Sequence, residues 1–263
     1  MMPALLSNRS RRPTGTVTPT WFLGTLASIS PGNLRALWLP TSADTTTNIS
    51  LSDLRVWTYD ATIAGQISTQ GQGVVVSFDG TNDYGSTPDT ADLSFPEPQP
   101  FSIVSLANVT DTGNHRNILS KFASSGVGAE WNIAVTAADL LSFNLFDDSV
   151  DKQPFRISSA AITMGALHLF GVSYNGGGGA TAANGITLYQ DGAVITSIAS
   201  NQALYVAMEN GTNIVGLGVY SNLSTSGRFQ GSMGFAAVYA ANLSLAQHAQ
   251  IKAAVNTYYE LSL

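Results

Sequence analysis

The chain has 263 residues, of which 44% are hydrophobic and only 11% charged, and its net charge is −6 at pH 7. That charged share is less than half of the roughly 25% typical of globular domains, so Ser, Thr, Asn, Gln and Gly must cover much of the surface. The composition excludes the clustered Lys and Arg of a nucleic-acid-binding face. The sequence contains no cysteine, which excludes disulfides, thiolate nucleophiles and cysteine-bound zinc.

No apolar run approaches the length of about 18 residues that a membrane span needs. Residues 1–6 are too short an apolar stretch for a secretion signal, and the basic residues follow them instead of preceding them. We therefore expect no membrane association and no signal peptide.

Residues 1–20 are predicted to form a flexible basic arm. The segment has no periodicity, and its basic residues are Arg9, Arg11 and Arg12. Such a segment cannot bury enough apolar surface to offset its own ordering entropy. It is therefore either a frayed terminus or an arm that orders when it binds a partner.

Residues 21–72 are predicted to be leader strands packed on the main domain. Two short apolar runs, residues 21–23 and 34–39, are bounded by Pro31-Gly32 and Pro40, which is typical of strands.

From residue 73 onward a regular all-β pattern begins. Short β-branched and aromatic segments alternate with Gly, Asn and Asp turns such as Asp79-Gly80 and Asp191-Gly192. This pattern predicts a sandwich or jelly roll over residues 73–263. The predicted strands are residues 74–78, 101–107, 117–122, 131–135, 140–146, 166–174, 186–190, 193–198, 214–219 and 231–239.

Near the end of the chain the spacing of the apolar residues changes from that of strands to that of a helix. Ser244 is followed three residues later by Gln247, which is a helix-capping signature, and apolar residues then recur at helical spacing. We expect one C-terminal helix docked on the sandwich, and β structure elsewhere.

Six segments resemble the laminin-G-like branch of the concanavalin A-like lectin/glucanase superfamily. They are residues 76–84 (VSFDGTNDY), 88–93 (PDTADL), 100–103 (PFSI), 117–121 (NILSK), 188–192 (LYQDG) and 229–235 (FQGSMGF). The resemblance covers roughly residues 74–260 and implies a concanavalin A-like jelly roll. Residues 31–39 (PGNLRALWL) are similar to the leader of phage-encoded members, which implies a virion protein.

Members of this superfamily often bind a structural calcium ion, and Asp79 and Asp83 match part of that site. The carboxylate usually found after the residue matching Gly231 is missing here. Calcium requires about six to eight oxygen ligands. Asp79 and Asp83 are therefore either calcium ligands or residues that shape a turn through side-chain hydrogen bonds. We predict no cofactor, with calcium as the alternative.

The acidic residues do not predict catalysis. Glycosidases need a pair of carboxylates that flank the scissile bond. The glucanases of the superfamily carry them at alternate positions of one strand, whereas none of the four glutamates here has an Asp two residues on. We predict no catalytic residues and no enzymatic activity.

Two functions are compatible with these features. The first is a virion structural protein on the exterior of a phage particle, such as a capsid decoration, head-fibre or tail-associated protein. It would assemble in the host cytoplasm, attach through its N-terminal region to capsid or tail subunits, and form a homo-oligomer.

The alternative is a carbohydrate-binding, lectin-like module for a host surface glycan. Sugar sites place an aromatic ring beside polar donors and acceptors. The candidate ligand contacts are His115, Arg116, Trp131 and Tyr220.

Overall fold

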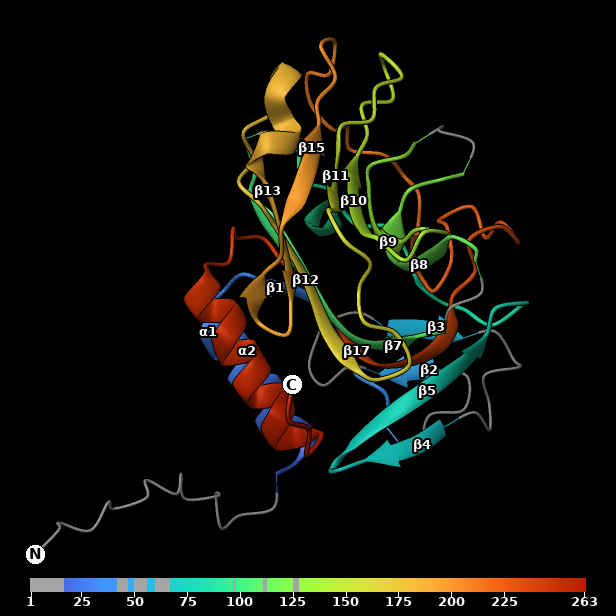
Figure 1. Cartoon of the computed structure of the whole chain (residues 1–263), viewed down its shortest axis with the longest axis vertical. Coiled ribbons are helices and arrows are strands. Elements are labelled where there is room, and N and C mark those ends of the chain that lie inside the picture. The colour runs from blue at the N-terminus through green and yellow to red at the C-terminus, as the bar shows by residue number, and fades with distance from the viewer. Residues whose placement is uncertain are drawn as a thin grey trace, which may run out of the picture.

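The computed structural model describes residues 17–41, 47–49, 56–59, 67–96, 98–110, 113–124 and 128–263. Two antiparallel sheets pack face to face, and two helices, α1 (Pro19–Ile29) and α2 (Leu245–Tyr258), cover the outer face of one sheet (Figure 1). The predicted jelly-roll sandwich with a C-terminal helix is confirmed.

The eight-stranded sheet is built around its longest strand, β17 (Gln230–Tyr239). One edge of β17 pairs with β7, while its other edge pairs first with β5 and then with β1. The sheet order is β14 (Ala193–Val194), β13 (Ile186–Gln190), β12 (His168–Tyr174), β7 (Phe101–Val109), β17, β5 (Gly73–Asp79) and β4 (Ile67–Gln70), with β1 (Leu34–Trp38) beside β17.

The nine-stranded sheet carries the strands that matter most for the site described below. Its order is β15 (Ser197–Ser200), β11 (Phe155–Ser158), β10 (Leu141–Leu145), β9 (Trp131–Val135), β8 (Arg116–Lys121), β16 (Val215–Leu217), β6 (Gly85–Thr87), β3 (Val56–Tyr59) and β2 (Thr47–Ile49). Two short 3-10 helices, η1 (Ala91–Leu93) and η2 (Gly179–Gly185), lie in connections.

Every strand predicted from residue 74 onward is present, although the segment 193–198 divides between β14 and β15. The short strands β6 and β11 were not predicted. Strands β8 to β11 lie on the far side of the molecule from α1 and α2 (Figure 1).

The main core lies between the two sheets and follows the alternation of side chains along a strand. On β9, Trp131, Ile133 and Val135 point into this core, while the residues between them point to the outer face of the sheet. The ring of Phe101 stacks on that of Phe95 with centroids 4.3 Å apart at the centre of the core. Full burial of each large apolar side chain stabilises the fold by about 1.5–3 kcal/mol.

The prediction of a strand at residues 21–23 is wrong, because these residues belong to helix α1. The Thr18 hydroxyl accepts a hydrogen bond from the Trp21 N–H over 3.2 Å, and Pro19 occupies the first turn, so the local sequence begins a helix. Phe22 and Leu26, four residues apart, both lie on its buried face. The described chain therefore contains two α-helices where one was expected.

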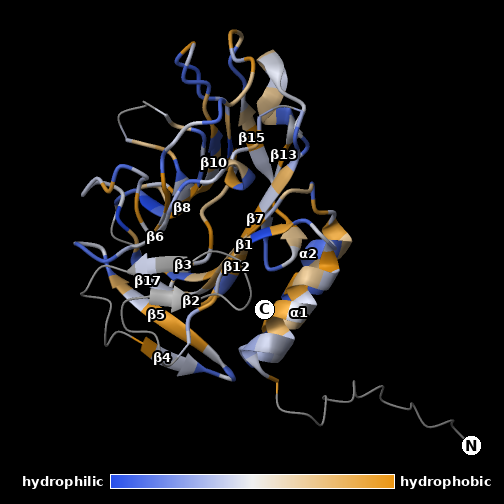
Figure 2. Ribbon diagram, turned by 180° about the vertical axis from the view of Figure 1, so that it is seen from behind, coloured by the Kyte–Doolittle hydropathy of each residue, from blue (hydrophilic) through white to orange (hydrophobic). Residues whose placement is uncertain are grey.

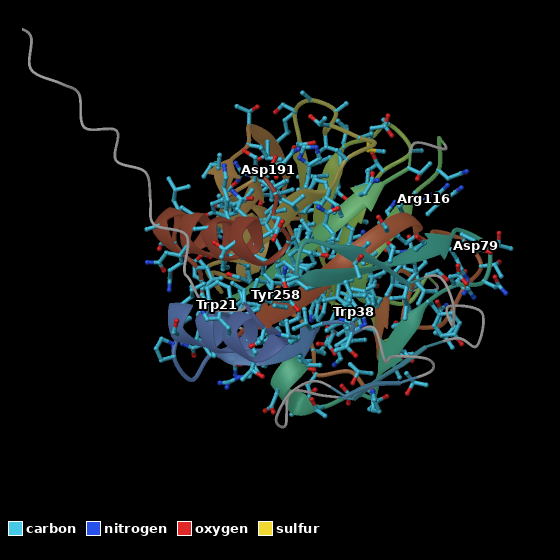
Figure 3. The ribbon with its side chains drawn as sticks, turned by 90° about the horizontal axis from the view of Figure 1, so that it is seen from below. Trp21, Trp38, Asp79, Arg116, Asp191 and Tyr258 are labelled. Atoms are coloured by element: carbon cyan, nitrogen blue, oxygen red, sulfur yellow. The ribbon has the colours of Figure 1, made fainter. Side chains whose placement is uncertain are left out.

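Helices α1 and α2 form a second core with the eight-stranded sheet. The ring of Phe22 stacks on that of Tyr258 at 4.6 Å, and the Tyr239 hydroxyl donates to the Leu26 carbonyl. Gln247 donates from Nε2 to the Ile29 carbonyl, which caps the end of α1. Figure 2 shows hydrophobic residues on β5 and along both helices, and Figure 3 places Tyr258 between the helices and the strands.

Helix α2 begins as predicted. Ser244 accepts from the Gln247 backbone and Gln247 accepts from the Ser244 backbone, so the capping box is complete. In the part of the chain that the structure describes, no helix is long and apolar enough to cross a membrane.

Candidate functional site

A recess of about 400 Å³ opens on the outer face of the nine-stranded sheet. Its volume lies within the range of about 300–1,000 Å³ that is usual for small-molecule sites. We call it the amide groove, because amide side chains cross its floor. It is lined by His115, Phe122, Asn132, Thr136, Ser142, Asn144, Gln153, Phe155, Ile157, Gln202 and Tyr220.

Three amides on the floor of the groove and the buried Asn117 beside it form a hydrogen-bonded ladder. Gln153 donates to Asn144 over 3.0 Å, Asn144 donates to Asn132 over 2.7 Å, and Asn132 donates to Asn117 over 2.9 Å. The ladder ends where Asn117 donates to the Gly227 carbonyl over 3.0 Å. Asn144 and Asn132 lie directly opposite each other on β10 and β9, so the sheet register sets the spacing of the ladder.

The ladder leaves hydrogen-bonding capacity for a ligand. A primary amide offers two N–H donors and two carbonyl lone pairs. Among the hydrogen bonds of the described residues, Asn132 and Asn144 each use one donor and accept one bond within the ladder. Each can therefore still donate one hydrogen bond and accept one.

Aromatic and aliphatic side chains form the walls. On one side Phe155 and Ile157 of β11 lie opposite Asn144 and Ser142 of β10. On the other side the rings of His115 and Tyr220 lie parallel, with an interplanar angle of 6° and centroids 5.8 Å apart, and Phe122 lies near Tyr220. Apolar walls around a polar floor are the usual composition of a ligand site.

The groove is electrically neutral. None of the described residues that line it is Asp, Glu, Lys or Arg. Burial lowers the pKa of His115, a hydrogen bond with Asn117 opposes this effect, and the nearby charge of Arg116 adds to the lowering. The imidazole is therefore uncharged at pH 7. Arg156 of β11 points away from the groove and donates from Nε to the Ser197 hydroxyl.

The structure brings together two of the four predicted ligand contacts, His115 and Tyr220. The structure corrects the prediction that Trp131 contacts a ligand. Trp131 is 0% exposed, packs in the main core beside Phe101, and donates from Nε1 to the Leu93 carbonyl. Its β-strand neighbour Asn132 faces the groove instead.

Arg116 does not line the groove. It is only 6% exposed, and its Nη1 donates to the His115 carbonyl over 3.1 Å. Figure 3 shows Arg116 toward the periphery, on the side of the molecule away from the helices. Its contribution is to hold the backbone beside His115.

Nine groove residues were not predicted from the sequence: Phe122, Asn132, Thr136, Ser142, Asn144, Gln153, Phe155, Ile157 and Gln202. A usable signal was present for two of them. In the segments WNIAV and LSFNL an amide alternates with large apolar residues, which places Asn132 and Asn144 on the face opposite the core.

The predicted calcium residues shape a turn. The Asp79 carboxylate accepts hydrogen bonds from the backbone N–H groups of Thr81 (2.7 Å) and Asn82 (3.2 Å), while the Asp83 carboxylate accepts one from the Asp79 N–H (2.7 Å). Burial raises the pKa of Asp79, but these donors outweigh it and bring the pKa below its usual value.

These residues do not fit a calcium ion. Arg228 donates from Nη1 to the Asn82 carbonyl over 2.8 Å, which places a permanent cation on the turn. Within the described ranges, no three His, Cys, Asp or Glu side chains form a metal-binding cluster. The geometry therefore agrees with the turn-shaping alternative.

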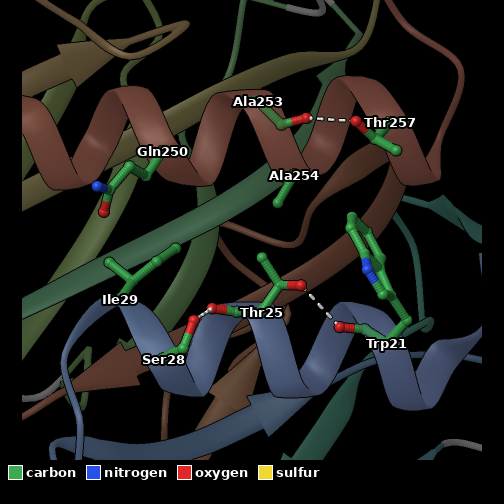
Figure 4. Close-up of a pocket in the computed structure, with 8 residues that line it drawn as sticks. All are labelled: Trp21, Thr25, Ser28, Ile29, Gln250, Ala253, Ala254 and Thr257. Carbon is green, nitrogen blue, oxygen red and sulfur yellow. Dashed lines mark hydrogen bonds between the residues drawn. The ribbon is translucent and has the colours of Figure 1, made fainter. Parts of the chain in front are cut away.

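A second recess, of about 420 Å³, lies between helices α1 and α2 (Figure 4). Its hydroxyl groups are used by the helices themselves: Thr25 donates to the Trp21 carbonyl and Thr257 donates to the Ala253 carbonyl. Few polar groups are therefore left to orient a ligand, and this recess is a poorer candidate than the amide groove.

A third recess, of about 270 Å³, contains two carboxylates, Asp148 and Glu209. Glu209 accepts from the N–H groups of Asp148 (2.6 Å) and Ser149 (3.0 Å), and Asp148 accepts from the Gly128 N–H (3.0 Å). Both carboxylates hold loop backbones together.

The arm residues Arg9, Arg11 and Arg12 lie outside the described residues. Attachment through this segment, assembly with capsid or tail subunits, and homo-oligomer formation therefore stay predictions.

Comparisons with known proteins identify solved structures that have a similar fold. The binding domain of Paraclostridial Mosquitocidal Protein 1 superposes with a TM-score of 0.60 at 14% identity, over 84% of this chain and 52% of that chain. The receptor binding domain of botulinum neurotoxin mosaic serotype C/D has a TM-score of 0.59 at 11% identity, over 84% of this chain and 50% of that chain. This chain thus spans about half the length of these two toxin domains.

A third solved structure is matched over nearly its whole length. It is Domain 4 of AbnA, a GH43 extracellular arabinanase from Geobacillus stearothermophilus, in complex with arabinotriose. Its TM-score is 0.58 at 14% identity, over 84% of this chain and 98% of that chain. At such low identities, these likenesses show the fold alone.

No curated protein sequence matches the chain. A laminin G family profile, described as Concanavalin A-like lectin/glucanases superfamily, matches residues 79–247, which is more than half of the chain. The chain therefore belongs to the concanavalin A-like lectin/glucanase superfamily.

Proposed function

We propose that this chain is a non-catalytic carbohydrate-binding module that holds a glycan in the amide groove. The observation that carries the proposal is the ladder of Gln153, Asn144 and Asn132 in a groove walled by the paired rings of His115 and Tyr220. A sugar hydroxyl both donates and accepts a hydrogen bond, as does each spare amide group of the ladder. The apolar face of a sugar ring can pack against an aromatic side chain.

The similarity to the arabinanase domain supports the proposal. That domain was solved in complex with arabinotriose, and this chain matches 98% of its length. The match therefore covers a complete module of a carbohydrate-active protein.

The composition of the groove favours binding over hydrolysis. A glycosidase needs two carboxylates across the scissile bond. Within the part of the chain that the structure describes, the lining of the amide groove contains neither Asp nor Glu. A glycan bound there would therefore lack both a general acid and a nucleophile.

A glycan array tests the proposal. The purified chain should bind a specific set of glycans, and Tyr220→Ala should weaken that binding about tenfold by removing one aromatic wall. Gln250→Ala, in the recess between the helices, is the control and should bind as the wild type does. Binding that is absent, or that survives Tyr220→Ala unchanged, would reject the amide groove as a glycan site. Release of reducing ends from a bound oligosaccharide would contradict the proposal that the chain does not hydrolyse glycans.

A role on the exterior of a virus particle is compatible with this site, and it is supported by the low charge and the basic arm. The deletion that tests it should remove residues 1–16 only, because Thr18 caps helix α1. This variant should keep the melting temperature of the full chain and lose attachment to the particle. If the variant still attaches to the particle, the arm is not needed for attachment.

A further inference from the structure

We infer that the amide groove selects neutral oligosaccharides and rejects acidic ones such as sialylated or uronate-containing glycans. The inference rests on the proposed function, since it names the class of glycan that the same groove holds. Its basis is the combination of a neutral lining with a floor of groups that each donate and accept.

The hydrogen-bonding pattern of the floor is suited to hydroxyl groups. Asn132 and Asn144 can each present one N–H and one carbonyl lone pair to a ligand, beyond the bonds they make within the ladder. A hydroxyl group satisfies such a pair completely. A carboxylate accepts hydrogen bonds but cannot donate them, so it would leave the spare carbonyl lone pairs unmatched and facing negative charge.

Among the described residues, no cation lines the groove to compensate an acidic sugar. Arg116 is turned to the His115 carbonyl, and Arg156 points away to the Ser197 hydroxyl. Transferring a carboxylate out of water without a partner cation is strongly unfavourable. The groove therefore rejects an acidic glycan because no described cation neutralises the carboxylate of the bound sugar.

The length of the ladder favours more than one sugar unit. Of the ladder residues that line the groove, Asn132 lies on β9, Asn144 lies on β10, and Gln153 lies just before β11. Neighbouring strands are about 4.8 Å apart, so the ladder is longer than a single sugar ring. The ligand is expected to lie across the strands, with successive units over successive amides.

The test uses the full chain on an array that carries neutral and acidic glycans in equal numbers. Gln153→Leu removes the first donor of the ladder from a partly buried loop, and Gln250→Leu makes the same change in the recess between the helices. We expect neutral oligosaccharides to bind. Gln153→Leu should weaken them by about threefold to tenfold, the value of one hydrogen bond, and Gln250→Leu should leave them unchanged.

Each of the other outcomes overturns a different claim. If acidic glycans bind and Gln153→Leu weakens them, the inference is wrong while the groove remains a glycan site. If nothing binds, or if binding is unaffected by Gln153→Leu, both the inference and the proposed function fail.

A charge-gain variant tests the reason for the selectivity. Gln202→Arg places a guanidinium in the groove, and Gln250→Arg is the matched control. Gln202→Arg should acquire measurable binding to acidic glycans that the wild type and the control lack. If it does not, the missing cation is not the cause of the rejection, and the charge argument is overturned.

Discussion

Asn144 on β10 donates a hydrogen bond from Nδ2 to Oδ1 of Asn132 on β9 over 2.7 Å, on the face of the sheet opposite the core. Both side chains are largely buried, with Asn132 only 2% exposed. Burial of an amide is unfavourable unless its polar atoms are hydrogen-bonded, so the two residues depend on each other. The ladder thus fixes the floor of the groove before any ligand arrives.

Replacing Asn132 by Leu should lower the stability of the fold. The substitution removes the acceptor of Asn144 and the donor to Asn117, and each buried group left unsatisfied costs about 1–3 kcal/mol. Urea denaturation should therefore show a free energy of unfolding lower by a few kcal/mol. Asn184→Leu, at an exposed amide pair with Asn201, should change it by less than about 0.5 kcal/mol. Equal effects at the two sites would contradict a structural role for the ladder.

The wall formed by Tyr220 should act through its ring. Its centroid lies 5.8 Å from that of His115, and aromatic contacts of this kind contribute about 0.5–1.5 kcal/mol beyond area burial. Titration calorimetry should show glycan affinity reduced less than about threefold in Tyr220→Phe, and about tenfold in Tyr220→Leu. Equal losses in both variants would assign the contribution to the hydroxyl group instead.

The sequence predicts the strand 131–135 with its observed bounds. It does not predict which side chain faces the groove, since Trp131 was expected to contact a ligand and Asn132 was not. At β9 and β10 the side chains on the outer face of the sheet are buried as well, so burial is continuous along both strands. Periodicity alone cannot predict burial on both faces. The identity of the residues does distinguish the faces, since Trp131 and Ile133 are large and apolar whereas Asn132 is polar.

Two other parts of the site were beyond local sequence reasoning. Strand β11 has only four residues, and its sequence FRIS combines two groove residues with an arginine on the opposite face. Tyr220 enters the groove from a loop whose path depends on contacts far away in sequence, such as Gly227 with Asn117. Helix α1, by contrast, carried a readable signal in Thr18-Pro19, which the apolar run after it obscured.

Calcium should not stabilise the protein. The carboxylates of Asp79 and Asp83 already accept backbone hydrogen bonds, and Arg228 donates to a carbonyl of the same turn. An ion present at a hundredfold excess over its dissociation constant would add about 2.7 kcal/mol. Thermal unfolding in millimolar calcium and in excess chelator should give the same melting temperature. A higher melting temperature in calcium would show that the turn rearranges to bind the ion.

The buried pair of Lys121 and Glu130 should be sensitive to loss of its cation. Lys121 Nζ contacts Glu130 directly, lies 2.8 Å from an oxygen of Asp89, and is fully buried. Lys121→Met leaves Glu130 without its cation, which typically costs about 3–5 kcal/mol. Urea denaturation at neutral pH should detect this loss.

The loss should also depend on pH. Burial raises the pKa of Glu130 to about 7 in spite of the neighbouring Lys121, whose charge lowers it. The pKa of Glu130 is higher in the folded chain than in the unfolded chain. The contribution of Glu130 to the free energy of unfolding is therefore fully present below about pH 4.5 and declines as pH rises through 7. Lys121→Met should therefore be less destabilising at pH 5 than at pH 8. Adding Glu130→Gln should remove this difference; if the difference persists, another group causes it.

His248 should make the fold sensitive to acid in the opposite direction. It is 1% exposed on the buried face of α2, its ring stacks on Tyr189 at 3.7 Å, and its Nε2 lies 2.9 Å from the Ser173 hydroxyl. The ring also requires Gly171, since a Cβ there would lie 2.8 Å from the His248 Cε1. This packing removes the imidazole from water, and burial lowers its pKa to about 4.

The unfolded chain protonates His248 near pH 6.5, whereas the folded chain resists protonation until about pH 4. Stability from this residue is therefore fully present above pH 6.5 and lost as pH falls toward 4, by about 1.4 kcal/mol for each pH unit. His248→Gln retains a group that can hydrogen-bond to Ser173 but has no proton to gain. Urea midpoints at pH 7, 5.5 and 4.5 should fall less steeply for this variant than for the wild type. A slope equal to that of the wild type would mean that α2 stays docked when His248 is charged, and that carboxylates alone set the acid sensitivity of the fold.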